Sequence, residues 1–113
     1  MSIDRLTNTE LLQQFSVLVQ TERKVLTRVL VFINEIELRK IHLLQGFASL
    51  FDFLTRHYGY SEGSAIRRIN AARLLREVPT CAAQIENGKL NLSQLNTARQ
   101  MFRTKEVLSL IHI

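Results

Sequence analysis

The sequence predicts an all-α fold, and three features of the chain lead to that prediction. No segment keeps the strict apolar–polar alternation of a half-buried β-strand. Residues 7–45 contain neither proline nor glycine, so nothing in them stops a helix. Between Gly59 and Pro79 the apolar residues recur with helical spacing. Glycine is favoured at a helix C-terminus and proline ends the helix before it, so these two residues mark helix boundaries. We therefore expect a long N-terminal helix, a helix-turn-helix and two further short helices.

The first segment, residues 1–46, is expected to be one long helix or two nearly continuous ones. The helical stretch runs from Thr7 to Gln45, and its N-terminal cap is expected at Asn8 or Thr9. Its apolar residues recur at steps of three and four: Leu11, Phe15, Leu18, Val25, Val29, Phe32 and Ile36. At 1.5 Å per residue such a helix is up to about 55 Å long, more than so small a domain covers. It is therefore a packing or dimerisation arm, covered by the chain's own C-terminal helices or by another copy.

Residues 47–79 have the outline of a helix-turn-helix. Ser49 is placed to cap a short helix that buries the nearby leucines and phenylalanines. Gly59 supplies the left-handed backbone that ends this helix, since only glycine adopts it without a side-chain clash. Ser61 then caps a second helix that ends before Pro79.

The second helix of this unit divides its residues between two sides. At 100° per residue one apolar face holds Ala65, Ile66, Ile69 and Ala72, and a later one holds Ala71, Leu74, Leu75 and Val78. Ser64, Arg67 and Arg68 fall away from the first face. The pattern predicts a helix that packs on one side and presents two arginines on the other.

Residues 80–107 are expected to complete the same domain with two helices. The first is Thr80 to Glu86, and the second runs from a cap at Asn91 or Ser93 to Met101 or Phe102. The last six residues, 108–113, read LSLIHI, which looks like the translation of an adaptor used in sequencing libraries. They are left out of the functional interpretation as a probable artefact.

The formal charge of +5 is concentrated in one part of the chain. Residues 1–60 have a net charge of +1 and residues 61–105 a net charge of +5. A concentrated positive charge favours a polyanion such as DNA. No apolar run is long enough for a membrane span and no signal peptide is recognisable, which predicts a cytoplasmic protein with no membrane partner. The single cysteine, Cys81, excludes an internal disulfide and a cysteine-built zinc site.

Several pieces at fixed spacing resemble the N-terminal helical region of bacterial HNH-endonuclease family proteins. They are Glu37 to Lys40, Gly46 to Phe53, Leu54 to Glu77 and Gly88 to Ser93, within a resemblance that covers about residues 8–105. Leu50 to Ala98 is also similar to the helix-turn-helix of ParB-type partition proteins. In the nuclease family the catalytic motif follows this region. The resemblance implies a DNA-binding module whose catalytic domain this chain lacks.

Candidate DNA contacts follow from the second helix, from that resemblance, and from the last helix, where Arg99 and Arg103 are expected to point outward and to be available to phosphates. They are Ser64, Arg67, Arg68, Asn70, Arg73, Arg99 and Arg103. We expect Arg67 and Arg68 to enter the major groove, because a recognition helix places its contacts in its first turns. The alternative for each arginine is a solvated helix face, with Arg73 and Glu77 as an i,i+4 pair.

No catalytic or metal site is expected in this chain, so whether it belongs to an enzyme stays open. HNH chemistry needs histidines clustered on a ββα element, whereas His42 and His57 are isolated and His112 lies in the excluded tail. No phosphate-binding loop is present, and we expect no cofactor or small-molecule ligand. The expected partner is double-stranded DNA. The alternative function is a helical dimerisation or scaffold module without direct DNA contact.

Overall fold

The computed structural model describes the backbone of residues 3–111 and the side chains of residues 3–101. The predicted all-α fold is confirmed, since the described residues form helices and no strand. After a 3₁₀ turn at Ile3–Arg5, the helices are α1 (Asn8–Arg39), α2 (Ile41–Leu44), α3 (Leu50–Asp52), α4 (Glu62–Glu77), α5 (Cys81–Glu86) and α6 (Leu92–Ile111). A π-helical turn, Phe53–His57, extends α3.

The long N-terminal segment forms two nearly continuous helices. Lys40 takes a left-handed conformation, with φ 55°, and separates α1 from α2. The cap of α1 is Thr7, whose hydroxyl accepts a hydrogen bond from the Glu10 amide at 3.2 Å. The predicted cap at Asn8 or Thr9 was therefore wrong, by one or two residues. The Thr7 hydroxyl lies three residues before the amide that donates to it, which is the usual spacing of a helix N-cap.

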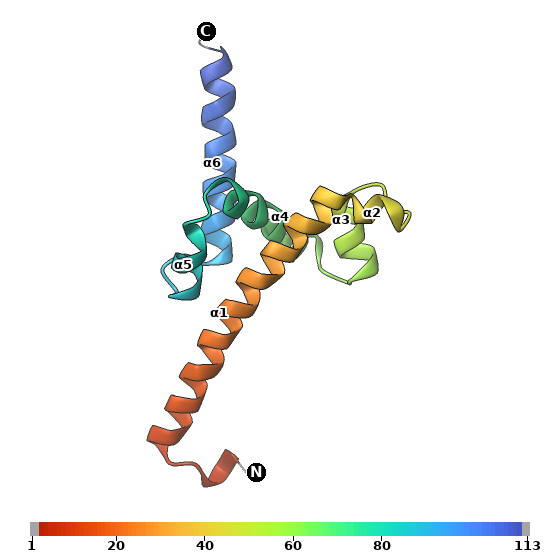
Figure 1. Cartoon of the computed structure of the whole chain (residues 1–113). Helices are drawn as coiled ribbons and strands as arrows, with labels where there is room; N and C mark the ends of the chain where they lie inside the picture. The colour runs from red at the N-terminus through yellow and green to blue at the C-terminus, as the bar shows by residue number, and fades with distance from the viewer. Residues whose placement is uncertain (1–2, 112–113) are drawn as a thin grey trace.

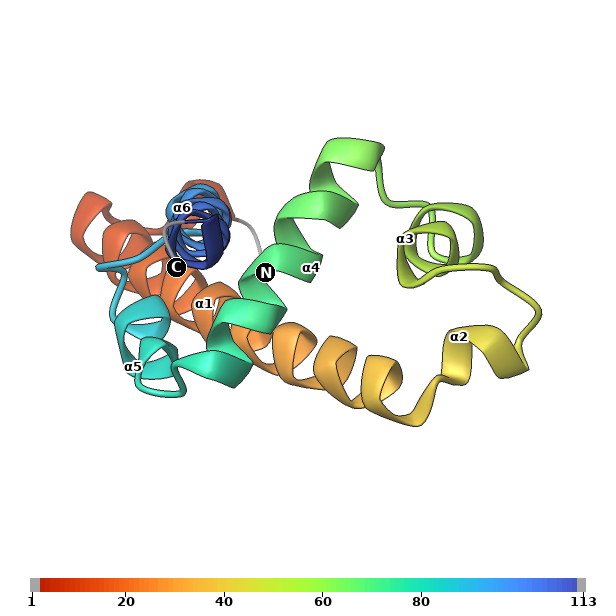
Figure 2. The ribbon, with the colours of Figure 1, turned by 90° about the horizontal axis from the view of Figure 1, so that it is seen from above.

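α4 is the centre of the fold. It packs against α1, α6 and α3, while α5 packs on α1 (Figures 1 and 2). Ala65, Ala71 and Ala72 are fully buried on α4, and such small side chains let neighbouring helices approach closely. The Asn34 side chain donates to the Ala72 carbonyl at 2.8 Å and ties α1 to α4. The core gathers Leu30, Ile33, Leu50, Phe53, Leu54, Ala65, Ile69, Ala71, Ala72, Leu74, Leu75, Cys81, Ile85 and Leu95.

The N-terminal half of α1 projects from this core as an arm (Figure 1). The buried residues of α1 are Thr27, Leu30 and Ile33, all in its second half. The radius of gyration is 17.7 Å, whereas a compact chain of this length has about 13 Å. The extents of 63 × 36 × 21 Å describe the same elongation. The helix is thus longer than its own domain covers, as its length predicted.

Two expectations about faces and ends were wrong. Ile66 was placed on the buried face of α4, but it is 44% exposed, because Ala65 and Ile69 take up the contact with the core. The last helix was expected to be short and to end at Met101 or Phe102. The backbone of α6 instead continues to Ile111, since residues 102–111 contain no glycine or proline to stop it.

Candidate nucleic-acid interface

The turn before α4 is built as the sequence predicted. Gly59 has φ +79°, and its amide donates to the Thr55 carbonyl at 3.1 Å. Ser61 caps α4 by accepting from the Ser64 amide at 3.2 Å. Figure 2 shows the first turn of α4 as the part of that helix farthest from α1. A capped helix therefore starts at the edge of the molecule, directly after a tight turn.

Arg67 is the candidate residue with the most available charge. It is half-buried and lies along the start of α4, where a Cβ added at Gly63 would be 3.1 Å from its Nη1. Among the described residues it has no ion-pair or hydrogen-bond partner. Gly63 thus leaves room for a guanidinium that the protein itself does not neutralise.

Arg68 takes a different direction from Arg67. Its guanidinium lies 4.7 Å from the centre of the Tyr60 ring, and it donates to the Ser64 carbonyl at 3.2 Å and to the Ser64 hydroxyl. Such a cation–π contact stabilises by about 0.5–1 kcal/mol at exposed sites. The charge of Arg68 is therefore partly engaged within the helix-turn-helix, and Ser64 serves as its acceptor.

Asn70 also has a partner inside the protein. Its side-chain amide donates to the Asn96 side chain at 2.7 Å, which links α4 to α6. The contact spans 26 residues of sequence. Asn70 therefore positions the two helices relative to each other. Its side-chain oxygen takes no part in this bond.

Arg73 and Arg76 share one carboxylate on α1. Arg73 Nη2 lies 2.7 Å from Glu37 Oε2, and Arg76 Nη1 lies 3.2 Å from Glu37 Oε1. The hydrogen bond from Arg73 is the largest cause that lowers the pKa of Glu37, and the charges of both arginines lower it further against the opposing effect of burial. These arginines hold α4 against α1, and the single Glu37 carboxylate balances one of their two positive charges.

The Glu37 carboxylate should make the stability of the fold depend on acid. Because its pKa is lower in the folded chain than in the unfolded one, its contribution is present above the ordinary carboxyl pKa of about 4.3 and disappears as the pH falls through the folded value. We expect Glu37→Gln to cost about 1 kcal/mol of unfolding free energy at pH 7 and progressively less towards pH 3. Urea denaturation across that range measures this difference, and a difference independent of pH would contradict it.

The expectation that Arg99 points outward was wrong, because in this fold its side chain lies against α4 and pairs with Glu77. Its side chain is only 12% exposed, and its Nη2 lies 3.2 Å from the Glu77 carboxylate. Nε and Nη1 of Arg99 have no acceptor among the described residues. The sequence suggested Arg73 as the partner of Glu77, but Arg73 pairs with Glu37. Arg103 lies outside the residues whose side chains are described.

The structure therefore separates residues that the sequence grouped together. Arg67 alone remains near the start of α4 without a described partner, with Ser64 and Arg68 beside it. Two residues that sequence reasoning missed are Glu37 and Asn96, which engage Arg73 and Asn70. For Tyr60 the sequence favours packing at the hinge over stacking on bases, and its ring lies beside the Arg68 guanidinium. Tyr60 follows Gly59 directly, so its place beside the second helix was a local signal. Glu37 and Asn96 lie far away along the chain and gave no such signal.

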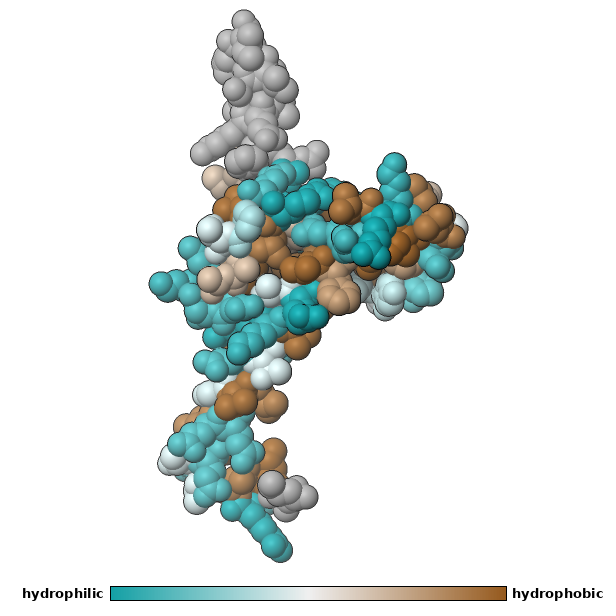
Figure 3. Space-filling view, viewed as in Figure 1, coloured by the Kyte–Doolittle hydropathy of each residue, from teal (hydrophilic) through white to brown (hydrophobic). Residues whose placement is uncertain are grey.

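A second surface is apolar and lies on α1. We name the "α1 stripe" as the residues at alternating steps of three and four: Leu11, Phe15, Leu18, Val25, Val29, Phe32 and Ile36. The packing expected for it is incomplete, since Phe15 is 60%, Leu18 65% and Phe32 59% exposed. Apolar side chains follow the projecting arm in Figure 3. An exposed series of large apolar side chains of this kind marks an interaction site.

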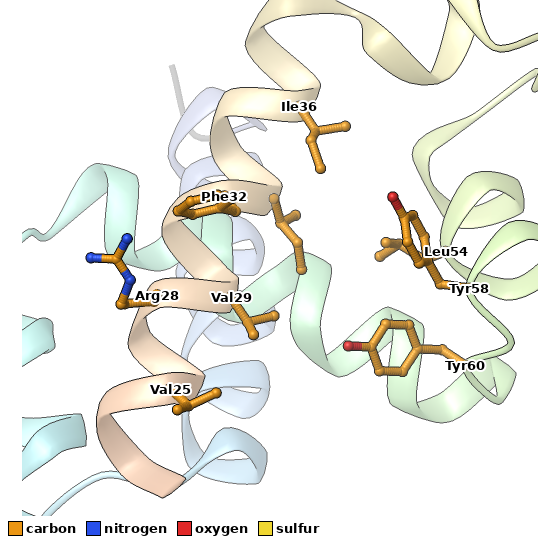
Figure 4. A pocket seen from close by; sticks show the side chains of 9 residues that line it. Val25, Arg28, Val29, Phe32, Ile36, Leu54, Tyr58 and Tyr60 are labelled. Atoms are coloured by element: carbon orange, nitrogen blue, oxygen red, sulfur yellow. The ribbon is translucent and has the colours of Figure 1, made fainter. Parts of the chain in front are cut away.

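The C-terminal half of the α1 stripe forms one wall of a groove. Its other wall consists of Leu54, Tyr58 and Tyr60, from the first half of the helix-turn-helix, and the cavity between them is about 370 Å³. Figure 4 shows both tyrosines extending from that unit towards α1. Arg28 lies next to Phe32 on the α1 side of the groove, and its guanidinium is 5.5 Å from the centre of the Phe32 ring. The groove is almost entirely apolar apart from Arg28 and the tyrosine hydroxyls.

A metal centre and a membrane-spanning helix are both absent from the described part of the chain. No group of three or more histidine, cysteine or carboxylate side chains there is placed to hold a metal ion. None of the helices described combines the length and the apolar character needed to cross a membrane. Comparison of the chain with protein-family models, with curated proteins and with solved structures gives no match.

Proposed function

We propose that this chain is a DNA-binding helix-turn-helix module, in which the N-terminal turns of α4 face the duplex. One observation carries the proposal: a capped helix begins after the Gly59 turn at the edge of the molecule, and it bears an arginine, Arg67, that no described acidic group neutralises. The net charge of +5 supports an anionic partner. Such a role places the protein in the cytoplasm.

The two arginines would have different tasks in the complex. Arg67 would contact a base edge or phosphate directly, as residues in the first turns of a recognition helix do. Arg68, held by Tyr60 and Ser64, would contact a phosphate from a preset position. Arg73 and Arg99 would instead keep α4 in place, since their guanidinium groups are used by Glu37 and Glu77.

The parent protein is proposed to be of the HNH-endonuclease type. This part of the proposal rests on the resemblance of the sequence pieces named above, which places a catalytic domain after the helical region. The module would then deliver a nuclease to DNA. It would supply affinity through phosphate contacts, and any sequence preference through the first turns of α4.

Salt dependence tests the DNA-binding role on the unmodified chain. Each phosphate neutralised lowers the logarithm of the binding constant by about 0.9 per tenfold rise in salt. With Arg67 and Arg68 both engaged, we expect a slope of about −2 or steeper between 50 and 200 mM salt. Fluorescence anisotropy with a labelled duplex measures it. A slope near zero, or no binding at 50 mM, would contradict the proposal.

A second candidate function is a helical assembly module that does not contact DNA itself. The exposed α1 stripe favours it, because an arm with so many apolar side chains gains stability by covering them. The two functions respond to salt in opposite ways, since apolar association holds or strengthens in salts such as sulfate. They are also compatible, because a symmetric dimer would present two copies of α4 to two half-sites.

A further inference from the structure

The two halves of the α1 stripe differ in shape. The N-terminal half, with Leu11, Phe15 and Leu18, is exposed on the projecting arm (Figure 1), and we call these residues the ridge. The C-terminal half lines the groove closed by Tyr58 and Tyr60 (Figure 4). Both belong to one series of three- and four-residue steps, which is the spacing of a coiled-coil seam. The chain thus carries a ridge and a groove at opposite ends of one helix.

We propose that a second copy of this chain covers the α1 stripe in an antiparallel arrangement, with the ridge of each copy in the groove of the other. The inference rests on the assembly role proposed above and does not depend on DNA contact. Reversing one helix about the middle of the stripe sets Phe15 opposite Phe32 and Leu18 opposite Val29. The ridge of each copy then lies against the groove of the other, so the same contact forms twice, as a two-fold axis requires.

Glu22 supplies the argument for the direction. It occupies the step between Leu18 and Val25, so it is the one charged position in the series from residue 11 to residue 36. In a parallel pair the two copies of Glu22 would face each other, and two like charges inside a seam oppose association. In the antiparallel pair Glu22 faces Val25, and the Glu22 and the Arg28 of the other copy each lie about one turn away from it along the axis, so the two carboxylates no longer share one layer and each has a guanidinium nearby. Arg28 lies beside the groove and has no carboxylate partner among the described residues.

Disulfide trapping in the full chain distinguishes the arrangements, with Cys81→Ala as background. Leu18→Cys combined with Val29→Cys should give a covalent dimer under mild oxidation, whereas either change alone should not. A covalent dimer from Leu18→Cys alone would show a parallel pair and overturn the antiparallel arrangement, while leaving the assembly role intact. A monomeric mass for the unmodified chain by light scattering, up to about 100 μM, would overturn both.

Charge exchange provides a second test that leaves the core untouched. Glu22→Arg should weaken dimerisation at least about tenfold, because the introduced guanidinium then lies near the Arg28 of the other copy, close to the middle of the seam. Glu22→Arg with Arg28→Glu should restore the dissociation constant to within a few-fold of that of the unmodified chain. Circular dichroism checks that helicity is unchanged. Equal dissociation constants for all three proteins by analytical ultracentrifugation would overturn the proposed pairing.

Discussion

Replacing Leu30 with alanine is expected to lower the unfolding free energy by about 2–5 kcal/mol. Leu30 lies on α1 at the centre of the core and is 0% exposed. The loss combines the transfer free energy of the removed carbons with the cavity that they leave. Domains of this size have only about 5–15 kcal/mol in total, so this single change would remove a large part of the stability.

The matched control for Leu30→Ala lies on the same helix. Leu38 is 72% exposed, and Leu38→Ala makes the same chemical change without opening a cavity. Its effect should stay within about 0.5 kcal/mol. Urea denaturation followed by circular dichroism at 222 nm measures both. Equal losses from the two variants would mean that Leu30 is not buried between α1 and its neighbours.

Changing Arg67 and Arg68 together to alanine should weaken duplex binding by about 2–5 kcal/mol, or roughly 30- to 5,000-fold. Most of the loss should come from Arg67, whose charge no described residue compensates. Arg68 should contribute less, because binding must compete with its contacts to Tyr60 and Ser64. Anisotropy at a fixed salt concentration measures the single and double variants.

A control variant that removes two positive charges elsewhere distinguishes a direct contact of α4 with DNA from the effect of the net charge of the protein. Arg5 and Lys24 are exposed and lie in the N-terminal part of the chain, outside the helix-turn-helix. Arg5→Ala with Lys24→Ala removes the same two charges and should weaken binding only by the change in net charge. If this control weakened binding as much as the Arg67 and Arg68 pair does, α4 would have no special role.

The parts of the fold that follow local rules could be predicted from the sequence. The caps at Ser49 and Ser61 and the left-handed Gly59 depend on residues within one helical turn, and all three are confirmed. The Thr7 cap was missed because several polar residues there offer the same chemistry. The extent of α6 was missed because its predicted end had no stop signal.

The partners of the polar residues could not be predicted in the same way. Helical spacing indicates that Arg73 leaves the buried face, but not that Glu37, 36 residues earlier, lies opposite it. The same holds for the bond between Asn70 and Asn96, which depends on how α4 and α6 cross. Periodicity assigns a residue to a face of its helix. Only the packing of helices decides whether that face meets solvent, a carboxylate or a neighbouring helix.

Amide chemical shifts during a titration with duplex DNA report which residues lie against the duplex. In ¹⁵N–¹H spectra of the full chain, we expect the largest changes on the first turns of α4, at Gly63, Ser64 and Arg67. Residues of the projecting arm, such as Phe15, should change little at the same DNA concentration. Changes confined to the arm, with the start of α4 unaffected, would contradict the assignment of α4 as the DNA-facing helix.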